Sequence, residues 1–260
     1  MDIRLDGRSA IITGGSKGLG LAIAKEMAAS GADVAVLARD PATLADAKGE
    51  LQKVSKAKVA AISCDVSKMA PIQAAYDQVM KEFGKVDILV NNAGQSQAGP
   101  ILQVTDEMWQ ADFDLKVFAA LRLVRLCMPQ MQERKWGRII NVLNIGAKAP
   151  GPRSVPTSVS RAAGLAITKV LAGEGAPHNV LCNALHVGII VSDQIVRRHA
   201  REGANVSLDA FIAKAGEAVP LGRMGKAEEF AAVATFLCSE QAGYVTGASI
   251  NVDGGRSPIW

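Results

Sequence analysis

Short apolar runs alternate along the chain with longer segments in which apolar residues recur every three or four positions. The short runs are rich in valine, isoleucine and leucine and predict strands at residues 9–13, 34–37, 59–63, 86–90, 138–142, 180–185 and 249–252. The longer segments predict helices. Strands alternating with helices predict βαβ units and a parallel sheet covered on both faces. We therefore expect an α/β fold, with a seven-stranded parallel sheet in one doubly wound domain.

Turn-forming residues lie between the predicted elements. Gly31 follows the first predicted helix, Pro41 opens the second and Gly84 closes the third. No linker rich in proline or serine and no internal repeat divides the chain, so we expect one domain over residues 1–260 rather than two smaller ones. Residues 189–220 are the least regular stretch, rich in charged and small side chains. We expect them to form a mobile substrate lid.

The composition argues against several classes of partner. The 29 basic and 25 acidic residues are spread along the chain, which favours neither a nucleic-acid nor a membrane surface. No apolar stretch reaches the roughly 20 residues of a membrane-spanning helix, and the N-terminus lacks the apolar core of a secretion signal, so we expect a soluble, cytoplasmic protein. The four cysteines and three histidines are scattered, which predicts buried reduced thiols and no metal site.

A glycine-rich turn, TGGSKGLG at residues 13–20, follows the first predicted strand and opens a predicted helix. Backbone amides and the dipole at a helix N-terminus favour a pyrophosphate, and glycines allow it to approach closely. The spacing of Gly14, Gly18 and Gly20 departs from the general dinucleotide pattern G-x-G-x-x-G. A purely structural turn is the alternative interpretation of this motif.

Further motifs lie in or directly after the later predicted strands: Asp65-Val66, NNAG at 91–94, IINV at 139–142, NALHVG at 183–188 and VTGASINVDGG at 245–255. With the glycine turn, which matches T-G-x-x-x-G-x-G, they resemble the short-chain dehydrogenase/reductase family over nearly the whole chain. The resemblance implies a Rossmann fold, a nicotinamide cofactor and a small-molecule substrate. It also implies a homotetramer or homodimer, formed through helices near 105–134 and 157–173 that carry Phe113, Val117, Leu121 and Leu165.

The resemblance also implies which residues contact the cofactor. These are Gly14, Ser16, Lys17, Gly18, Leu19, Gly20, Arg39, Asp65, Val66, Asn92, Ala93, Gly94, Arg161, Gly188, Ile190 and Ser192. The second predicted strand is followed by Arg39 where an NAD-binding member would carry an acidic residue. Arg39 and Lys17 can meet a 2′-phosphate, so we expect NADP(H) rather than NAD. The alternative is that both are solvated surface charges.

Members of the family usually reduce a carbonyl with an Asn, a Ser, a Tyr and a Lys. The tyrosine transfers the proton, and the lysine lowers its pKa and holds the nicotinamide ribose. The matching positions of this chain carry four different residues, Lys116, Asn144, Thr157 and Arg161. The two tyrosines of the chain, Tyr76 and Tyr244, belong to other segments.

The four replacements differ in chemistry. Arg161 keeps the positive charge but is a poor proton donor, and Asn144 keeps an amide that can polarise a substrate oxygen. Thr157 is a weaker acid than a phenol and has a shorter reach. Lys116 is the one new group that could exchange a proton, provided that Arg161 and burial lower its pKa. The alternative is that Lys116 only fills the vacated space.

Two further features have a functional and a structural interpretation. His186 lies beside the expected cofactor loop but could equally pack at the strand end. The run of Arg197, Arg198, His199 and Arg201 could bind an anionic substrate or form a solvated helix face.

Three functions are compatible with the sequence. The favoured one is an NADP(H)-dependent oxidoreductase with a rebuilt proton relay, since some family members that reduce conjugated acyl thioesters lack the tyrosine. The second is an inactive cofactor-binding protein that acts as a regulator or an oligomer partner. The third is non-redox chemistry on the same scaffold, because the fold alone does not choose a reaction.

Overall fold

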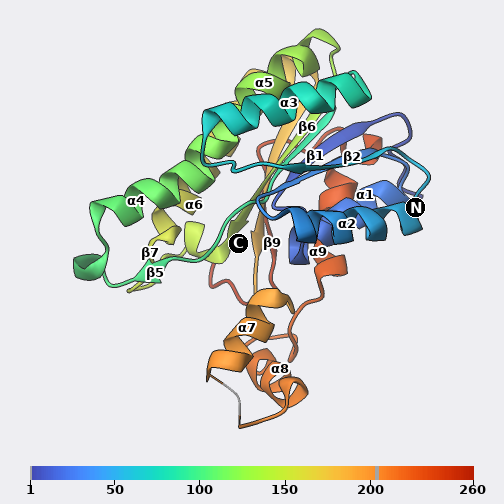
Figure 1. Ribbon diagram of the computed structural model, residues 1–260. Coiled ribbons are helices and arrows are strands. Elements are labelled where there is room, and N and C mark those ends of the chain that lie inside the picture. The colour runs from blue at the N-terminus through green and yellow to red at the C-terminus, as the bar shows by residue number, and fades with distance from the viewer. Residues whose placement is uncertain (1, 203–204) are drawn as a thin grey trace.

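The computed structural model describes residues 2–202 and 205–260. Its centre is a seven-stranded parallel sheet with the strand order β3-β2-β1-β4-β6-β8-β9 (Figure 1). The strands are β1 Ser9–Thr13, β2 Asp33–Ala38, β3 Val59–Ser63, β4 Ile88–Asn91, β6 Gly137–Asn144, β8 Val180–Val187 and β9 Ser249–Val252. The predicted α/β fold with seven parallel strands is confirmed.

Helices cover both faces of the sheet. The helices are α1 Gly18–Ala29, α2 Pro41–Val54, α3 Met69–Phe83, α4 Asp106–Phe113, α5 Ala119–Glu133, α6 Thr157–Gly175, α7 Asp193–Glu202, α8 Leu208–Gly216 and α9 Ala227–Leu237. One core contains side chains of α1, α2 and α9, and the other contains side chains of α3, α5 and α6. Short 3-10 turns lie at Ile101–Gln103, Ile145–Ala147, Ala176–His178 and Glu240–Ala242.

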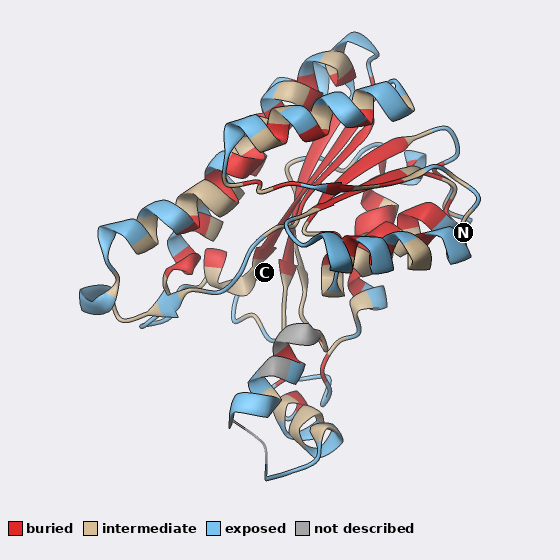
Figure 2. Ribbon diagram, viewed as in Figure 1, coloured by how far each residue is buried: buried red, intermediate tan, exposed pale blue. Residues whose placement is uncertain are grey.

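The apolar runs in the sequence reflect strands that are buried on both faces. In β1, Ala10 and Ile12 belong to one core and Ile11 to the other, and all three are fully buried. Figure 2 shows the sheet as a buried layer between helices that bury only their inner sides. A strand between two cores needs apolar side chains on both of its faces, which is why these strands read as near-continuous apolar runs.

The helix expected over residues 105–134 is interrupted. Thr105 caps α4, accepting a hydrogen bond from the Met108 N–H at 3.4 Å, but a π-helical segment, η2 Asp114–Phe118, separates α4 from α5. A two-stranded antiparallel ribbon, β5 Ala98–Gly99 with β7 Val155–Pro156, is a second feature that the sequence did not predict. Its strands are two residues each, too short to give an alternating pattern.

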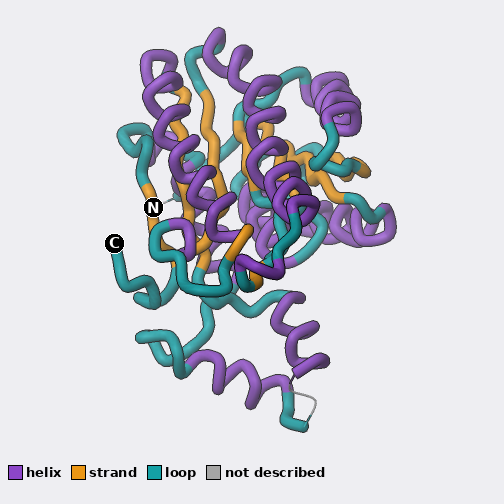
Figure 3. The backbone as a smooth tube through the Cα atoms, turned by 90° about the vertical axis from the view of Figure 1, so that its left-hand side faces the viewer, coloured by secondary structure: helices purple, strands orange, loops and turns teal. Residues whose placement is uncertain are grey.

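The segment expected to be an irregular lid contains two helices, α7 and α8, that project from the rest of the domain (Figure 3). Ser207 caps α8 by accepting from the Ala210 N–H at 3.2 Å. His199 of α7 packs edge-on against Phe211 of α8, with ring centroids 5.4 Å apart. This contact favours a structural role for His199, as part of the packing between the two helices. The side chain of Arg197 and residues 203–204 lie outside the described residues. No described helix is both long and apolar enough to cross a membrane.

Candidate active site

The candidate site lies at the carboxyl ends of β1 and β4, adjacent strands whose helices lie on opposite faces of the sheet. Crevices at such a reversal are where α/β proteins bind ligands. Thr13, the last residue of β1, accepts hydrogen bonds from the N–H groups of Asn92 at 3.0 Å and Ala93 at 2.9 Å. Asn92 Nδ2 in turn donates to the Thr13 carbonyl at 2.9 Å. The NNAG motif is therefore fastened to the start of the glycine turn.

The glycine turn has a geometry that suits an anion. Gly14 and Gly18 have φ angles of +64° and +52°, and a Cβ atom at Gly20 would overlap the Gly14 carbonyl oxygen. Lys17, the N-cap of α1, makes no side-chain hydrogen bond to the helix. The Lys17 side chain therefore does not cap the first N–H groups of α1. N–H groups left uncapped in this way can donate hydrogen bonds to a phosphate. A Cβ at Gly18 would be 3.9 Å from Ser192, so the loop after β8 borders the same turn.

The remaining sequence-predicted cofactor residues lie around this edge in different ways. Arg39 and Lys17 are exposed, and Asp65 is partly buried after β3. Ser16 accepts a hydrogen bond from Thr43 Oγ1 at 3.3 Å, and Gly188 follows β8, where a Cβ would collide with Asp253. Three predicted contacts have side chains in or against the hydrophobic cores: Val66 and Ile190 are buried, and Leu19 is partly buried.

A buried polar cluster forms the floor of the site. The Lys116 ammonium, in η2, donates to one oxygen of Asp112 and to Thr157 Oγ1 at 3.0 Å. The other Asp112 oxygen accepts from Ser160 Oγ at 2.5 Å. The Asp112 and Lys116 side chains are each 1% exposed. The cluster thus joins α4 and η2 to the start of α6.

Two members of this cluster, Asp112 and Ser160, were missed in the sequence. An acidic residue four positions before Lys116 is a recognisable helical pairing signal. Such pairs usually lie on solvated helix faces, however, so the spacing alone does not indicate burial.

Thr157 receives a second hydrogen bond, from the backbone N–H of Gln97 at 3.0 Å. Gln97 precedes β5, and Thr157 follows β7, so the small ribbon holds the two residues together. A hydroxyl has two acceptor lone pairs and one hydrogen. With both lone pairs engaged, the Thr157 hydroxyl has its own hydrogen left to donate.

Arg161 lies beside Lys116 at the same floor. Its Nη1 donates to the Val142 carbonyl at 2.6 Å, and its buried Nε has no hydrogen bond partner among the described residues. A Cβ at Gly94 would collide with Arg161 Nη2 and would lie 3.6 Å from Lys116 Cε. A cavity of about 20 Å³ is lined by Lys116, Arg161 and Ser160, among others. Two cations and the NNAG motif thus meet at one point.

The two cations have lowered pKa values for the same main reason, burial. Desolvation lowers the pKa of Lys116, the hydrogen bond to Asp112 opposes this, and the nearby Arg161 charge lowers it further. Burial lowers the pKa of Arg161 to about 10, against the opposing effect of Asp112. Lys116 is therefore better suited to proton exchange than an exposed lysine.

Asn144 ends β6, and its carbonyl accepts from His186 Nδ1 at 2.8 Å. His186 is fully buried, and its Nε2 lies 2.8 Å from Ser249 Oγ on β9. Burial lowers the pKa of His186, so the ring is neutral, with its proton on Nδ1 facing the carbonyl. These contacts favour the structural interpretation of His186. The side-chain Oδ1 of Asn144 has no partner among the described residues.

The tyrosines and cysteines lie where the sequence indicated. Tyr76 is on α3 and accepts from Gln130 Nε2 at 2.6 Å, and Tyr244 is fully exposed before β9. All four cysteines are free and buried, as predicted.

Comparison with known proteins gives consistent matches. A family model described as enoyl-(acyl carrier protein) reductase matches residues 14–257. An uncharacterized oxidoreductase of Methylorubrum extorquens is 33% identical over 97% of this chain and 98% of its own. The 3-oxoacyl-(acyl-carrier-protein) reductase of Aquifex aeolicus is 30% identical over 98% of this chain and 99% of its own. The chain belongs to the short-chain dehydrogenase/reductase family.

Solved structures of this family agree in fold. L-sorbose reductase from Gluconobacter frateurii, complexed with NADPH and L-sorbose, superposes with a TM-score of 0.94 at 33% identity, and the match covers 100% of both chains. The protein is therefore an oxidoreductase of the short-chain dehydrogenase/reductase type.

Proposed function

We propose that the protein is an NADP(H)-dependent oxidoreductase in which Lys116, Asn144, Thr157 and Arg161 take the places of the family's Asn, Ser, Tyr and Lys. The proposal rests above all on the buried contact between the Lys116 ammonium and the Thr157 hydroxyl, with Nζ and Oγ1 3.0 Å apart. This contact provides a proton source and a hydrogen bond donor at one point of the site.

The cofactor proposal rests on the carboxyl edge of the sheet. The N-terminus of α1 suits a pyrophosphate, and the exposed cations Lys17 and Arg39 suit a 2′-phosphate. The NADPH bound to L-sorbose reductase supports the same choice of cofactor. Further contacts would come from Gly14, Ser16, Gly18, Leu19, Gly20, Asp65, Val66, Asn92, Ala93, Gly94, Arg161, Gly188, Ile190 and Ser192. When bound, the cofactor supplies or accepts a hydride.

In the reductive direction, the substrate oxygen gains negative charge and needs a proton. The Thr157 hydroxyl donates its hydrogen to that oxygen, and the Lys116 ammonium returns a proton to the Thr157 oxygen. Lys116 is left as a neutral amine, and burial and Arg161 lower its pKa and so ease this loss. Arg161 keeps a fixed positive charge beside the site, and the Asn144 amide can orient the substrate oxygen.

We infer a small-molecule substrate in which a carbonyl is conjugated to the carbon that receives the hydride. An aliphatic hydroxyl is a weaker acid than a phenol with a pKa near 10. Conjugation spreads the developing charge, so a hydrogen bond from Thr157 supplies much of the stabilisation that the reaction needs.

The wider organisation belongs to the same proposal. The chain is proposed to form one cofactor-binding domain over residues 1–260, with residues 189–220, including α7 and α8, as a lid over the substrate. A homotetramer or homodimer is proposed as the working form.

The test is NADPH oxidation with a panel of conjugated and simple carbonyl compounds, comparing the natural protein with Lys116→Met. We expect turnover of a conjugated compound and a loss of about 10² to 10⁴ in rate in the variant, with unchanged NADPH affinity. Lys169→Met, which removes an exposed cation of α6, is the control and should keep full activity.

Full turnover by Lys116→Met would overturn the proposed proton relay. NADPH binding without turnover of any compound in the panel would instead favour an inactive cofactor-binding protein.

A further inference from the structure

Asp112 is a buried carboxylate that the proposed proton step does not use. It lies on α4, one helical turn before Lys116, and its side chain is 1% exposed. One oxygen accepts from the Lys116 ammonium and the other from Ser160 Oγ at 2.5 Å. A carboxylate removed from water is stable only when paired and hydrogen-bonded, and both oxygens meet that condition.

The charges around Lys116 give Asp112 a distinct role. Arg161 is the second cation at this floor, and Asp112 is the anion that acts on both Lys116 and Arg161. The neighbouring carboxylate, Asp114, pairs with Arg122 at 3.1 Å, at side chains that are 27% and 22% exposed. Without Asp112, the described residues that line this pocket would supply two cations and no opposite charge, and the ammonium would lose its proton first.

The direction of the hydrogen bonds matters as much as the charge. Lys116 holds its ammonium between Asp112 and Thr157, with one donor hydrogen for each. Ser160 lies on α6, one turn after Thr157 begins that helix, so its bond to Asp112 ties the carboxylate to the helix that carries Thr157. A lysine side chain is long and flexible, and two fixed acceptors hold its end in one place.

We propose that Asp112, fixed by Ser160, is the positioning residue of this site: it keeps Lys116 as an ammonium and directs it at the Thr157 hydroxyl. This inference rests on the proposed function, because it assigns a role beside the same proton step. Asp112 does not reach the substrate oxygen in this scheme, and it acts through Lys116.

The experiment compares Asp112→Asn with Asp114→Asn, which neutralises the nearby carboxylate outside the cluster. On the conjugated substrate identified by the panel, Asp112→Asn should lower kcat by about 10-fold or more, with KM and NADPH affinity unchanged. The basic limb of its kcat–pH profile should move to lower pH, because an ammonium without its counter-charge loses its proton more readily. Asp114→Asn should match the natural protein in all these measurements.

Two further measurements complement this comparison: Ser160→Ala serves if Asp112→Asn is too unstable for kinetics, and thermal unfolding needs no substrate. Ser160→Ala should move the basic limb in the same direction by a smaller amount. Thermal unfolding of Asp112→Asn and the natural protein should be followed from about pH 6 to about pH 10. The loss of stability in the variant should shrink as pH rises, because its folded state disfavours the ammonium and so binds fewer protons than its unfolded state. If the substitution removed only a neutral packing contact, the loss of stability in Asp112→Asn would be the same at every pH.

The outcomes separate this inference from the proposed function. An unshifted pH profile and natural kcat in Asp112→Asn, with Lys116→Met inactive, would overturn the role of Asp112 and leave the proton relay standing. A pH-independent unfolding deficit would also overturn it. Full activity in Lys116→Met would overturn the relay and this inference with it.

Discussion

At the scale of single residues, the site is defined by charges and hydroxyls that contact one another away from water. Lys116 is held by Asp112 and Thr157, and Arg161 packs against the space left by Gly94. At the outer rim the charges are exposed instead, as at Lys17 and Arg39. Buried groups can tune proton transfer, whereas exposed cations act on the phosphate groups of a ligand.

Arg39→Asp is expected to reverse the preference between cofactors. A charge-assisted contact to phosphate contributes roughly 1.5 to 3 kcal/mol, so NADPH affinity should fall about tenfold or more. NADH affinity should be unchanged or improved, because a carboxylate can bind the ribose 2′-hydroxyl. Isothermal titration calorimetry with both cofactors measures the two affinities.

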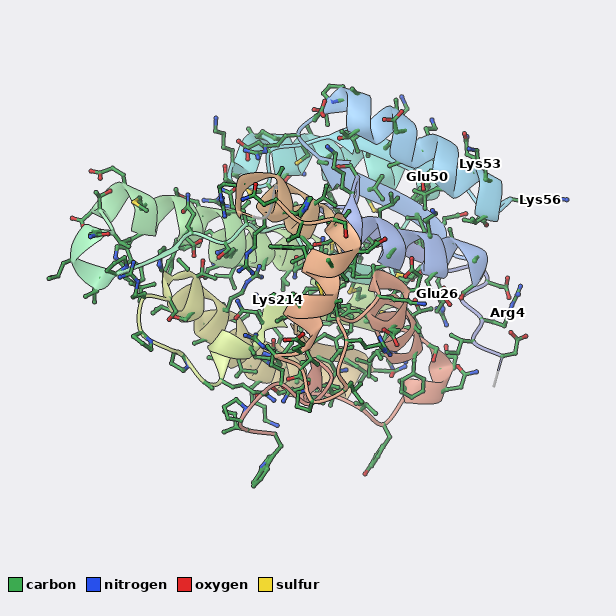
Figure 4. All side chains as sticks on the ribbon, turned by 90° about the horizontal axis from the view of Figure 1, so that it is seen from below. Arg4, Glu26, Glu50, Lys53, Lys56 and Lys214 are labelled. Carbon is green, nitrogen blue, oxygen red and sulfur yellow. The ribbon has the colours of Figure 1, made fainter. Side chains whose placement is uncertain are left out.

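The control for this charge change is Lys53→Asp. Lys53 lies in the last turn of α2, the helix that follows Arg39 in the chain, and its side chain points outward (Figure 4). It should leave both affinities unchanged. Equal affinities of the natural protein for NADPH and NADH would contradict the assignment of Arg39.

At the scale of elements, the glycine turn depends on close contact between β1, α1 and the loop after β4. A Cβ atom at Gly20 would be within 2.9 Å of the Gly14 carbonyl carbon and would overlap the Asn92 amide. Both neighbours are already fixed by hydrogen bonds to Thr13 and the turn. The turn therefore has no room to adjust around a larger residue.

Gly20→Ala is expected to destabilise the protein by about 1 to 3 kcal/mol through overpacking and to abolish NADPH binding. Gly49→Ala is the matched change, because Gly49 lies inside α2 and no described atom outside its own helix backbone lies within 4 Å of the added Cβ. It should raise stability by about 0.5 to 1 kcal/mol. Urea unfolding measures both, and a Gly20→Ala protein as stable as the natural one would show that the turn can relax.

At the scale of the whole molecule, apolar side chains remain on the surface near η2 and α6. Phe118, Val159 and Val170 are 40%, 41% and 58% exposed. Of the side chains expected to lie between subunits, Val117 is instead buried within its own chain, at 6% exposure. Both Val117 and Phe118 belong to η2. The exposed apolar side chain of this segment is therefore Phe118 and not Val117, which the sequence had suggested.

Val170→Asp is expected to dissociate the proposed oligomer. A buried valine contributes about 1.5 to 3 kcal/mol, and an unpaired carboxylate in its place adds a desolvation cost at each interface. Light scattering should give a dimer or tetramer for the natural protein and a smaller species for this variant. Val54→Asp, at an exposed site at the end of α2, should keep the natural mass, whereas a monomeric natural protein would contradict the proposal.

The sheet and the glycine turn could be predicted from local sequence patterns. Strands that are buried on both faces carry near-continuous apolar runs, so β1 was predicted with the bounds that the structure gives. The tight approach of α1 to β1 admits only glycine at Gly20, which leaves a local signature. These features depend on neighbours in the chain and on the period of the elements.

The contacts that build the candidate site could not be predicted in this way, because they join segments that are far apart in the chain. Asp112 and Ser160 are 48 positions apart, and nothing in either segment indicates that they meet. Gln97 meets Thr157 through a ribbon too short to leave a pattern. The π-helical segment interrupts a stretch whose apolar pattern reads as one helix. Local patterns report burial and period, whereas the pairing of buried polar groups depends on which helices pack together, and that is decided by the whole fold.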